Sequence, residues 1–228
     1  MSENFIINDF KGWEAKNYFF LGGMIIVQFF TFSLNPTSWL TLIGSLCGII
    51  CVNLIALGKA SNYLFGLVSA LIIGYFGLIT QVYAEVLLQG FYIIMDLTGL
   101  YTWLKVSEDG SGTVTKVKIL KDVQWLYTVI TWLVIGCATF LLLGSINDAQ
   151  PALDALTFSV SATAMILMIF RYQSQFVFWL LGNFFSIFLW FRAGVHAGGD
   201  YAIFVMYCMY TVNSVFGMIN WLKIKQKN

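Results

Sequence analysis

Charged residues are scarce in this sequence. Asp, Glu, Lys and Arg together make up only 10% of the 228 residues, whereas 59% are hydrophobic. A soluble domain carries about 25% charged residues, so this chain has too few to cover a surface in water. The net charge of only +1 predicts that nucleic acid is not a partner.

Sequence signatures of catalysis and of cofactor binding are also missing. The chain has no Gly-x-x-x-x-Gly-Lys-Ser/Thr loop for nucleotide phosphates and no His-Glu-x-x-His zinc motif. Its four cysteines show no metal-binding spacing, and we interpret them as small apolar packing residues. We therefore expect a protein that is not an enzyme and that carries no cofactor.

Long apolar runs take the place of the missing polar surface. Runs of about 20 residues are typical of membrane helices, and continuous runs favour helices over a β-barrel, whose strands alternate. We predict an all-α integral membrane protein with eight transmembrane helices, at residues 17–34, 38–57, 63–82, 86–104, 123–145, 153–170, 176–194 and 201–222.

The basic residues favour one side of the membrane. With eight spans, eleven of the 12 lysines and arginines fall on the side of the N-terminus, and only Arg192 falls on the other. Because cytoplasmic loops carry the excess of positive charge, both termini are predicted to be cytoplasmic. The first sixteen residues are too polar for a cleaved signal peptide, so we expect the first span to be retained.

A short motif occurs twice, 118 residues apart. GLYTWLK at 99–105 and GMINWLK at 217–223 both read Gly-x-x-x-Trp-Leu-Lys. A shift of 113 places GKASNYLFG (58–66) on RYQSQFVFW (171–179). The alternative is chance similarity between apolar segments; we favour an internal repeat.

Each copy of the repeat holds three predicted spans, and one more span lies between the copies. Three spans would invert the second copy, and the single linker span restores its direction. The resulting parallel 3+1+3 repeat, with an extra N-terminal helix, is a transporter architecture whose site lies between the halves. The predicted divisions are an N-terminal segment with the extra helix, a first repeat, a loop with the linker helix, a second repeat and a tail, at 1–37, 38–104, 105–147, 148–223 and 224–228.

Polar and aromatic side chains form stripes along the predicted spans. On the fourth span they recur every three or four residues, which places them on one face of a helix, and the seventh and eighth spans show the same pattern. Aromatic rings stack on flat ligands, and amides bind carboxamide or hydroxyl groups. The predicted substrate-binding residues are Trp179, Asn183, Gln89 and Asp96, followed by Tyr92, Trp190, Tyr210 and Asn213.

Other roles for the polar residues are open at this point. Polar side chains also hold membrane helices together. Asp96 invites a functional interpretation because a carboxyl group is costly inside a membrane. It would face a cationic ligand, accept ribose hydroxyls, carry a proton or form a structural hydrogen bond. Gln175, Trp103 and Trp221 lie near span ends, where we interpret them as interfacial anchors.

Two stretches resemble the PnuC family of bacterial inner-membrane vitamin transporters. YAEVLLQGFYIIMDLTGLYTW (83–103) is similar to the first-repeat pattern of that family, and FWLLGNFFSIFLWFRAG (178–194) is similar to the start of its second repeat. The resemblance covers about residues 38–222 and implies a SWEET-like fold with 3+1+3 spans. Glu85 stands where aspartate is commoner in the family, so the substrate subgroup is open.

The resemblance implies facilitated diffusion of nicotinamide riboside, which a cytoplasmic kinase then traps. The planar, cationic nicotinamide ring fits an aromatic slot beside Asp96; thiamine fits the same description, and riboflavin is a substrate of a sister group. The alternative outside this class is a membrane sensor or scaffold that moves no solute.

We expect membrane lipid to surround the helices. The helices outside the repeats are free to pack between protomers of a homo-oligomer, for which the sequence carries no signature.

Overall fold

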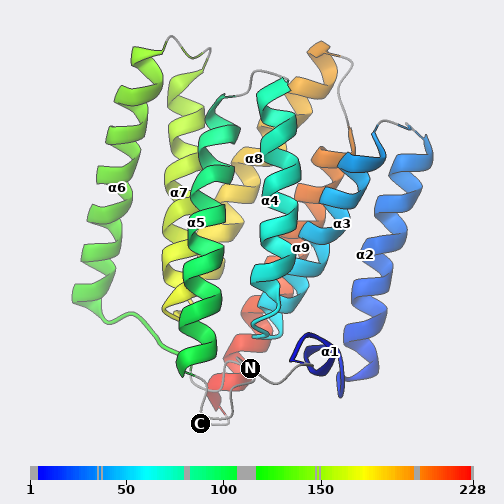
Figure 1. Cartoon of the computed structure of the whole chain (residues 1–228). Coiled ribbons are helices and arrows are strands. Elements are labelled where there is room, and N and C mark those ends of the chain that lie inside the picture. The colour runs from blue at the N-terminus through cyan, green and yellow to red at the C-terminus, as the bar shows by residue number, and fades with distance from the viewer. Residues whose placement is uncertain are drawn as a thin grey trace.

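The chain folds into a bundle of helices (Figure 1). The structure is a computed structural model that describes residues 5–34, 36, 38–79, 83–106, 117–146, 148, 150–197 and 201–226. Within these residues a short helix precedes eight long ones: α1 (Phe5–Asp9), α2 (Ala15–Leu34), α3 (Trp39–Ala56), α4 (Asn62–Ile79), α5 (Tyr83–Val106), α6 (Asp122–Ser145), α7 (Pro151–Ile169), α8 (Gln175–Ala197) and α9 (Tyr201–Gln226).

Each predicted span coincides with one of the helices α2 to α9. Six of them, α2, α3, α4, α6, α7 and α9, contain a stretch long and apolar enough to cross a membrane. The other two are α5 and α8. Helix α5 carries Glu85, Asp96 and Lys105, and the apolar part of α8 extends only over Gln175–Phe188 among the described residues. The last residues of the predicted span 63–82, and most of the polar loop after α5, lie outside the described residues.

The long helices form two groups of three. Helices α3, α4 and α5 pack in succession, as do α7, α8 and α9. The groups meet where α3 packs against α9 and where α5 packs against α7. Helix α6 packs on α7 at one edge of the bundle, and α2 packs on α3 and α9 at the other (Figure 1).

The repeated Gly-x-x-x-Trp-Leu-Lys motifs connect the two groups reciprocally. Trp103 at the end of α5 donates its indole N–H to the carbonyl of Ile169 at the end of α7, over 3.1 Å. Trp221 at the end of α9 donates to the carbonyl of Ile55 at the end of α3, over 2.9 Å. The last carbonyls of a helix lack intrahelical partners. Each group of helices therefore supplies a donor to a helix end of the other.

The glycine of each motif makes room for an aromatic ring. A Cβ on Gly99 would come within 2.2 Å of the Tyr63 ring, and a Cβ on Gly217 within 2.4 Å of the Phe176 ring. Tyr63 meets Trp103 edge to face, with ring centroids 5.1 Å apart. Phe176 meets the tryptophan of the second motif in the same way, at 5.4 Å. The glycine and the tryptophan of each motif thus hold one ring from a neighbouring helix.

The interpretation of Trp103, Trp221 and Gln175 as interfacial anchors is wrong. Their exposed fractions are 2%, 0% and 0%. An anchor in the aromatic belt faces the lipid headgroups, whereas these side chains face the interior. The hydrogen bonds of the two indoles give the physical reason, because a buried indole N–H needs an acceptor.

The turns that follow α3 and α7 are built alike. Gly58 and Arg171, which the repeat aligns, both have positive φ angles, 68° and 62°. Each turn returns a backbone N–H to a carbonyl five residues earlier, from Lys59 to Leu54 and from Tyr172 to Leu167, over 2.9 Å in both cases. This is the pattern of a Schellman motif, in which glycine is the preferred residue.

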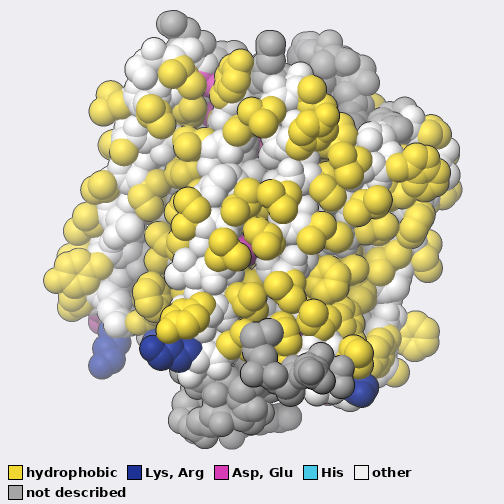
Figure 2. Space-filling model, in the orientation of Figure 1, with side chains coloured by type: hydrophobic (Ala, Val, Ile, Leu, Met, Phe, Trp, Pro, Cys, Tyr) yellow, Lys and Arg dark blue, Asp and Glu magenta, His cyan; other side chains and the backbone are white. Residues whose placement is uncertain are grey.

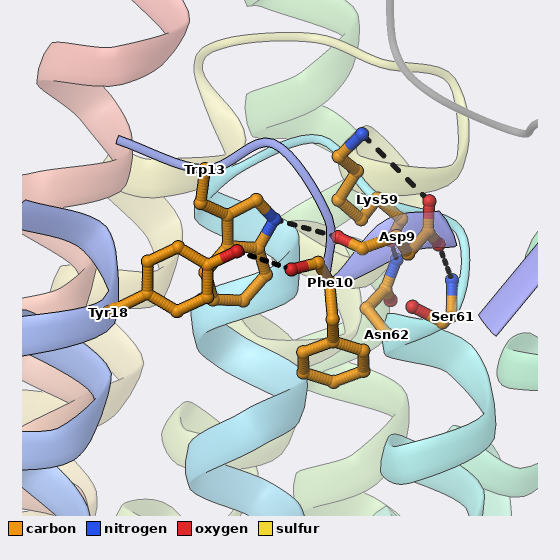
Figure 3. A network of polar contacts seen from close by, with 7 residues as sticks. All are labelled: Asp9, Phe10, Trp13, Tyr18, Lys59, Ser61 and Asn62. Carbon is orange, nitrogen blue, oxygen red and sulfur yellow. Dashed lines mark hydrogen bonds and ion pairs between the residues drawn. The ribbon is translucent and has the colours of Figure 1, made fainter. Parts of the chain in front are cut away.

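The N-terminal segment docks on the turn between α3 and α4 (Figure 3). Asp9 is 2% exposed, accepts a hydrogen bond from the backbone N–H of Ser61 at 3.0 Å, and lies 3.9 Å from Lys59 Nζ. A carboxylate here satisfies a free N–H at the start of α4 and interacts favourably with the helix dipole. Trp13 Nε1 donates to the Asp9 carbonyl at 2.7 Å. The polar segment before the first span is therefore attached to the bundle.

The outside of the bundle is apolar along its length and basic at one end (Figure 2). Exposed hydrophobic side chains are frequent on the two edge helices, for example Phe19 and Ile26 on α2 and Leu126 and Leu141 on α6. The Lys and Arg side chains visible in Figure 2 lie at the end of the molecule where α1 lies and α9 ends. The apolar sides are those of a protein surrounded by lipid.

The two indole hydrogen bonds are predicted to differ in strength. Ile169 O has no second hydrogen bond among the described residues, because the Gln173 N–H donates to Lys118 instead, whereas Ile55 O also accepts from Gly58 N–H. Trp103→Phe leaves a buried acceptor unpaired, which costs about 1–3 kcal/mol; Trp221→Phe removes one of two bonds, which costs about 0.5–1.5 kcal/mol. Thermal unfolding in detergent measures both.

The control for this experiment is Trp39→Phe, because the Trp39 side chain is 70% exposed. We expect the melting temperature to fall most for Trp103→Phe, less for Trp221→Phe and least for the control. A melting temperature of Trp103→Phe equal to that of the control would contradict the structural role of the bond.

Asp9→Ala is predicted to destabilise the start of α4. Removing a side-chain acceptor from a helix N-terminus costs about 0.5–2 kcal/mol, and Asp9→Asn, which keeps an acceptor, should cost less. Glu14→Ala is the control, since Glu14 pairs with Lys16 on the surface and exposed ion pairs contribute little. Unfolding followed by circular dichroism tests this; equal effects of Asp9→Ala and Glu14→Ala would refute it.

Candidate functional site

A cavity of about 100 Å³ lies between the two groups of helices. Its lining comes from α3, α4 and α5 on one side and from α7, α8 and α9 on the other. Among the described residues, α2 and α6 contribute nothing to it. The lining residues are Gly48, Cys51, Val52 and Ile55 on α3, Gly66, Ser69, Ala70 and Ile73 on α4, Gln89, Tyr92 and Asp96 on α5, Ser161, Met165 and Met168 on α7, Phe176, Trp179 and Asn183 on α8, and Met206, Tyr207, Tyr210, Asn213 and Ser214 on α9.

Seven of the eight residues that the polar stripes singled out line this cavity. Trp190 is the exception, since it packs against the cluster of Ile203, Met206 and Tyr207. The structure brings together Gln89, Tyr92, Asp96, Trp179, Asn183, Tyr210 and Asn213.

Small and flexible residues complete the lining, and the sequence analysis did not single them out. Ser69 and Ser161 form hydrogen bonds with the hydroxyls of Tyr210 and Tyr92. They lie in apolar helices, where a single hydroxyl produces no periodic signal. Tyr207 did carry a signal, because it precedes Tyr210 by three residues on one helix face.

Trp179 forms an aromatic wall of the cavity. The repeat aligns it with Gly66 on α4, which also lines the cavity. The Tyr92 ring lies beside the indole, with centroids 6.2 Å apart at an angle of 52°. The indole N–H of Trp179 is buried and has no hydrogen-bond partner among the described residues. The wall can therefore stack on a flat ring and also donate a hydrogen bond.

Asp96 contributes a carboxyl group to the lining of this cavity. The residue is 4% exposed, and a Cβ on Gly66 would lie 2.8 Å from its Oδ2. The described lysines and arginines include none that forms an ion pair with it. A buried carboxyl group without a basic partner is costly, and a cationic ligand in the cavity would compensate it.

The chemistry available in this cavity is recognition. Among the described residues, no three His, Cys, Asp or Glu side chains lie close enough together to hold a metal ion. Aromatic rings, amides, hydroxyls and one carboxyl group line this cavity, as in sites for small polar ligands. Inside a bundle of apolar helices, such a site between two similar halves defines a class of protein, the membrane transporters of small solutes.

Comparison with known proteins gives the family. Residues 38–223 match the family described as nicotinamide mononucleotide transporter. The nicotinamide riboside transporter PnuC of Neisseria mucosa is 34% identical over 225 residues, which cover 96% of this chain and 85% of that protein. The protein of the same name from Haemophilus influenzae is 32% identical over 222 residues, with 95% and 94% covered.

A solved structure agrees with this result. The crystal structure of the vitamin B3 transporter PnuC superposes with a TM-score of 0.89 at 33% identity, over 100% of this chain and 99% of the other. The chain therefore belongs to the PnuC family of transporters, as the two quoted stretches indicated. It is a multi-pass membrane protein of a transporter family, and its relatives are not enzymes.

Proposed function

We propose that this chain carries nicotinamide riboside across the membrane by facilitated diffusion. The observation that carries the proposal is that the Trp179 indole and the Asp96 carboxyl group line the same cavity. The ligand has a flat, cationic ring and a hydroxyl-rich sugar. An aromatic face attracts such a cation, and the carboxyl group offers a charge or accepts hydroxyl protons. The names of the relatives support the same substrate.

Each predicted residue has a role in this proposal. Trp179 stacks on the ring of the ligand, and Asn183 and Gln89 form hydrogen bonds with it. Asp96 accepts hydrogen bonds from the ribose hydroxyls or interacts with the positive charge of the ring. Tyr92, Tyr210 and Asn213 line the cavity, and Trp190 supports it from the cluster around Tyr207.

Transport in this proposal follows the concentration gradient, and a cytoplasmic kinase traps the product. The absence of a phosphate-binding loop motif from the sequence supports a passive mechanism. Thiamine, also flat and cationic, is the alternative ligand that this cavity suits. Liposomes containing the purified chain test the mechanism, because a passive carrier equilibrates the riboside without concentrating it.

We further propose that α2 to α9 all cross the membrane, as a 3+1+3 repeat with an extra first helix. The reciprocal tryptophan bonds, the matching turns at Gly58 and Arg171 and the two groups of three helices support this arrangement. The proposed divisions are those of the sequence analysis, with repeats at 38–104 and 148–223 joined through α6.

We propose that the basic end of the bundle faces the cytoplasm, which places both termini there. The distribution of Lys and Arg supports it. Helices α2 and α6 expose most of their apolar residues, so they are the surfaces offered to lipid or to a second protomer. Cysteine accessibility in inverted and right-side-out vesicles would test the orientation.

Trp179→Ala and Asn183→Ala are predicted to weaken binding of the riboside in folded protein. Stacking of a base on an aromatic side chain contributes about 1–3 kcal/mol, so Trp179→Ala should raise the Kd about fivefold or more. Calorimetric titration and flux into liposomes measure both variants, with the exposed Trp39→Ala as the control. Normal flux through both folded variants would overturn the proposed site. No solute flux through the wild-type chain would favour a sensor or scaffold.

Gly66→Ala is predicted to reduce affinity by displacing the Asp96 carboxyl group. The added Cβ would lie 2.8 Å from Oδ2, so that the carboxyl group must shift. Gly90→Ala on α5 is the matched control, because a Cβ there meets nothing within 4 Å. Calorimetric titration should show weaker riboside binding only for Gly66→Ala. Equal affinities of the two variants for the riboside would contradict a role of the Asp96 carboxyl group in binding.

A further inference from the structure

Three amide side chains line the cavity, and each one donates one of its two N–H groups to the protein. Gln89 Nε2 donates to Glu85 Oε1 at 2.6 Å, Asn213 Nδ2 donates to the backbone carbonyl of Val52 at 2.6 Å, and Asn183 Nδ2 donates to Ser214 Oγ at 3.3 Å. The amide oxygens accept none of these three bonds, so each can accept a hydrogen bond from a ligand.

The chemistry of each partner determines the direction of these bonds. The carbonyl of Val52 has no proton to give, and Glu85 Oε1 is the acceptor of the bond from Gln89. The Ser214 hydroxyl already donates its proton to the carbonyl of Tyr210 at 2.8 Å, so it accepts from Asn183. The oxygen of Asn213 is buried and has no partner among the described residues.

Asp96 adds two more acceptor atoms to this lining. The amides and the carboxyl group therefore offer a ligand acceptors from both halves of the bundle. The hydroxyls of Tyr92 and Tyr210 are paired with serines, and the Trp179 N–H is an unpaired donor. The carboxyl group of Asp96 and the unpartnered oxygen of Asn213 thus favour a ligand that donates hydrogen bonds.

We propose that this lining selects the carboxamide form of the ligand over the carboxylate form, and that Glu85 is the positioning residue that holds Gln89 as an acceptor. The inference rests on the proposed function. A carboxamide donates two N–H groups to acceptors, whereas a carboxylate of the same shape donates none. A site built for a hydrogen bond discriminates strongly against an analogue that lacks it.

Glu85 acts through Gln89 in this proposal. It lies one helical turn away, is 6% exposed and is absent from the cavity lining. Among the described residues it forms no ion pair, and its hydrogen bond is the one to Gln89. In Glu85→Gln the partner becomes an amide, which both donates and accepts. Gln89 can then turn and present its NH₂ group to the cavity, where it would bind a carboxylate. Glu85→Asp keeps a partner that only accepts.

The experiment is calorimetric titration of the full chain in detergent with nicotinamide riboside and with nicotinic acid riboside. For the wild type we expect the carboxamide to bind at least about tenfold more tightly. Glu85→Gln should lower the ratio of the two affinities several-fold, chiefly because the acid binds more tightly. Glu85→Asp should keep the ratio of the wild type. A role of Glu85 in stability alone would change both affinities together and leave the ratio unchanged.

The outcomes separate the two proposals. If the riboside binds and the acid binds equally well to the wild type, the inference is overturned and the proposed function stands. If neither binds, both are overturned. If the ratio is at least tenfold in the wild type and unchanged in folded Glu85→Gln, the role of Glu85 is overturned. The wild-type ratio tests the selectivity even if a variant fails to fold.

Discussion

The reciprocal hydrogen bonds from Trp103 and Trp221 are the interaction on which the rest of the structure depends. Each joins a helix of one group to the carbonyl end of a helix in the other, in surroundings where water does not replace a missing partner. Neither group of three helices is complete without the second. These bonds join the groups at one end of the bundle, and Phe176, which packs against Trp221, also lines the cavity.

The two groups share a scaffold and differ where they face the cavity. The alignment of the repeat pairs Gly66 with Trp179 and Asp96 with Ser214. One side therefore supplies space and a carboxyl group, and the other supplies a wall and a hydroxyl. A ligand with one flat cationic end and one hydroxyl-rich end meets different partners on the two sides, so the asymmetry gives it a single preferred orientation.

The sequence predicted well which segments form helices and which residues share a helix face. It predicted less well where along the axis a side chain lies and which residues it packs against. Apolar runs of about 20 residues have few alternatives to a membrane helix, and spacing of three and four placed Gln89 and Asp96 on one face. Trp190 follows Asn183 by seven residues, so it lies on the same face of α8 but about two turns further along the axis. At that level it packs against Tyr207 and does not line the cavity. Periodicity reports which way a side chain points and says nothing of where a cavity ends.

The residues that sequence reasoning misplaced are those whose partners lie far away in the chain. Trp103 sits near a span end, where an anchor and a buried donor look alike, and the carbonyl that decides between them is 66 residues away. Because the two bonds join the same two groups in opposite directions, a motion that separated the groups at this end would have to break both of them.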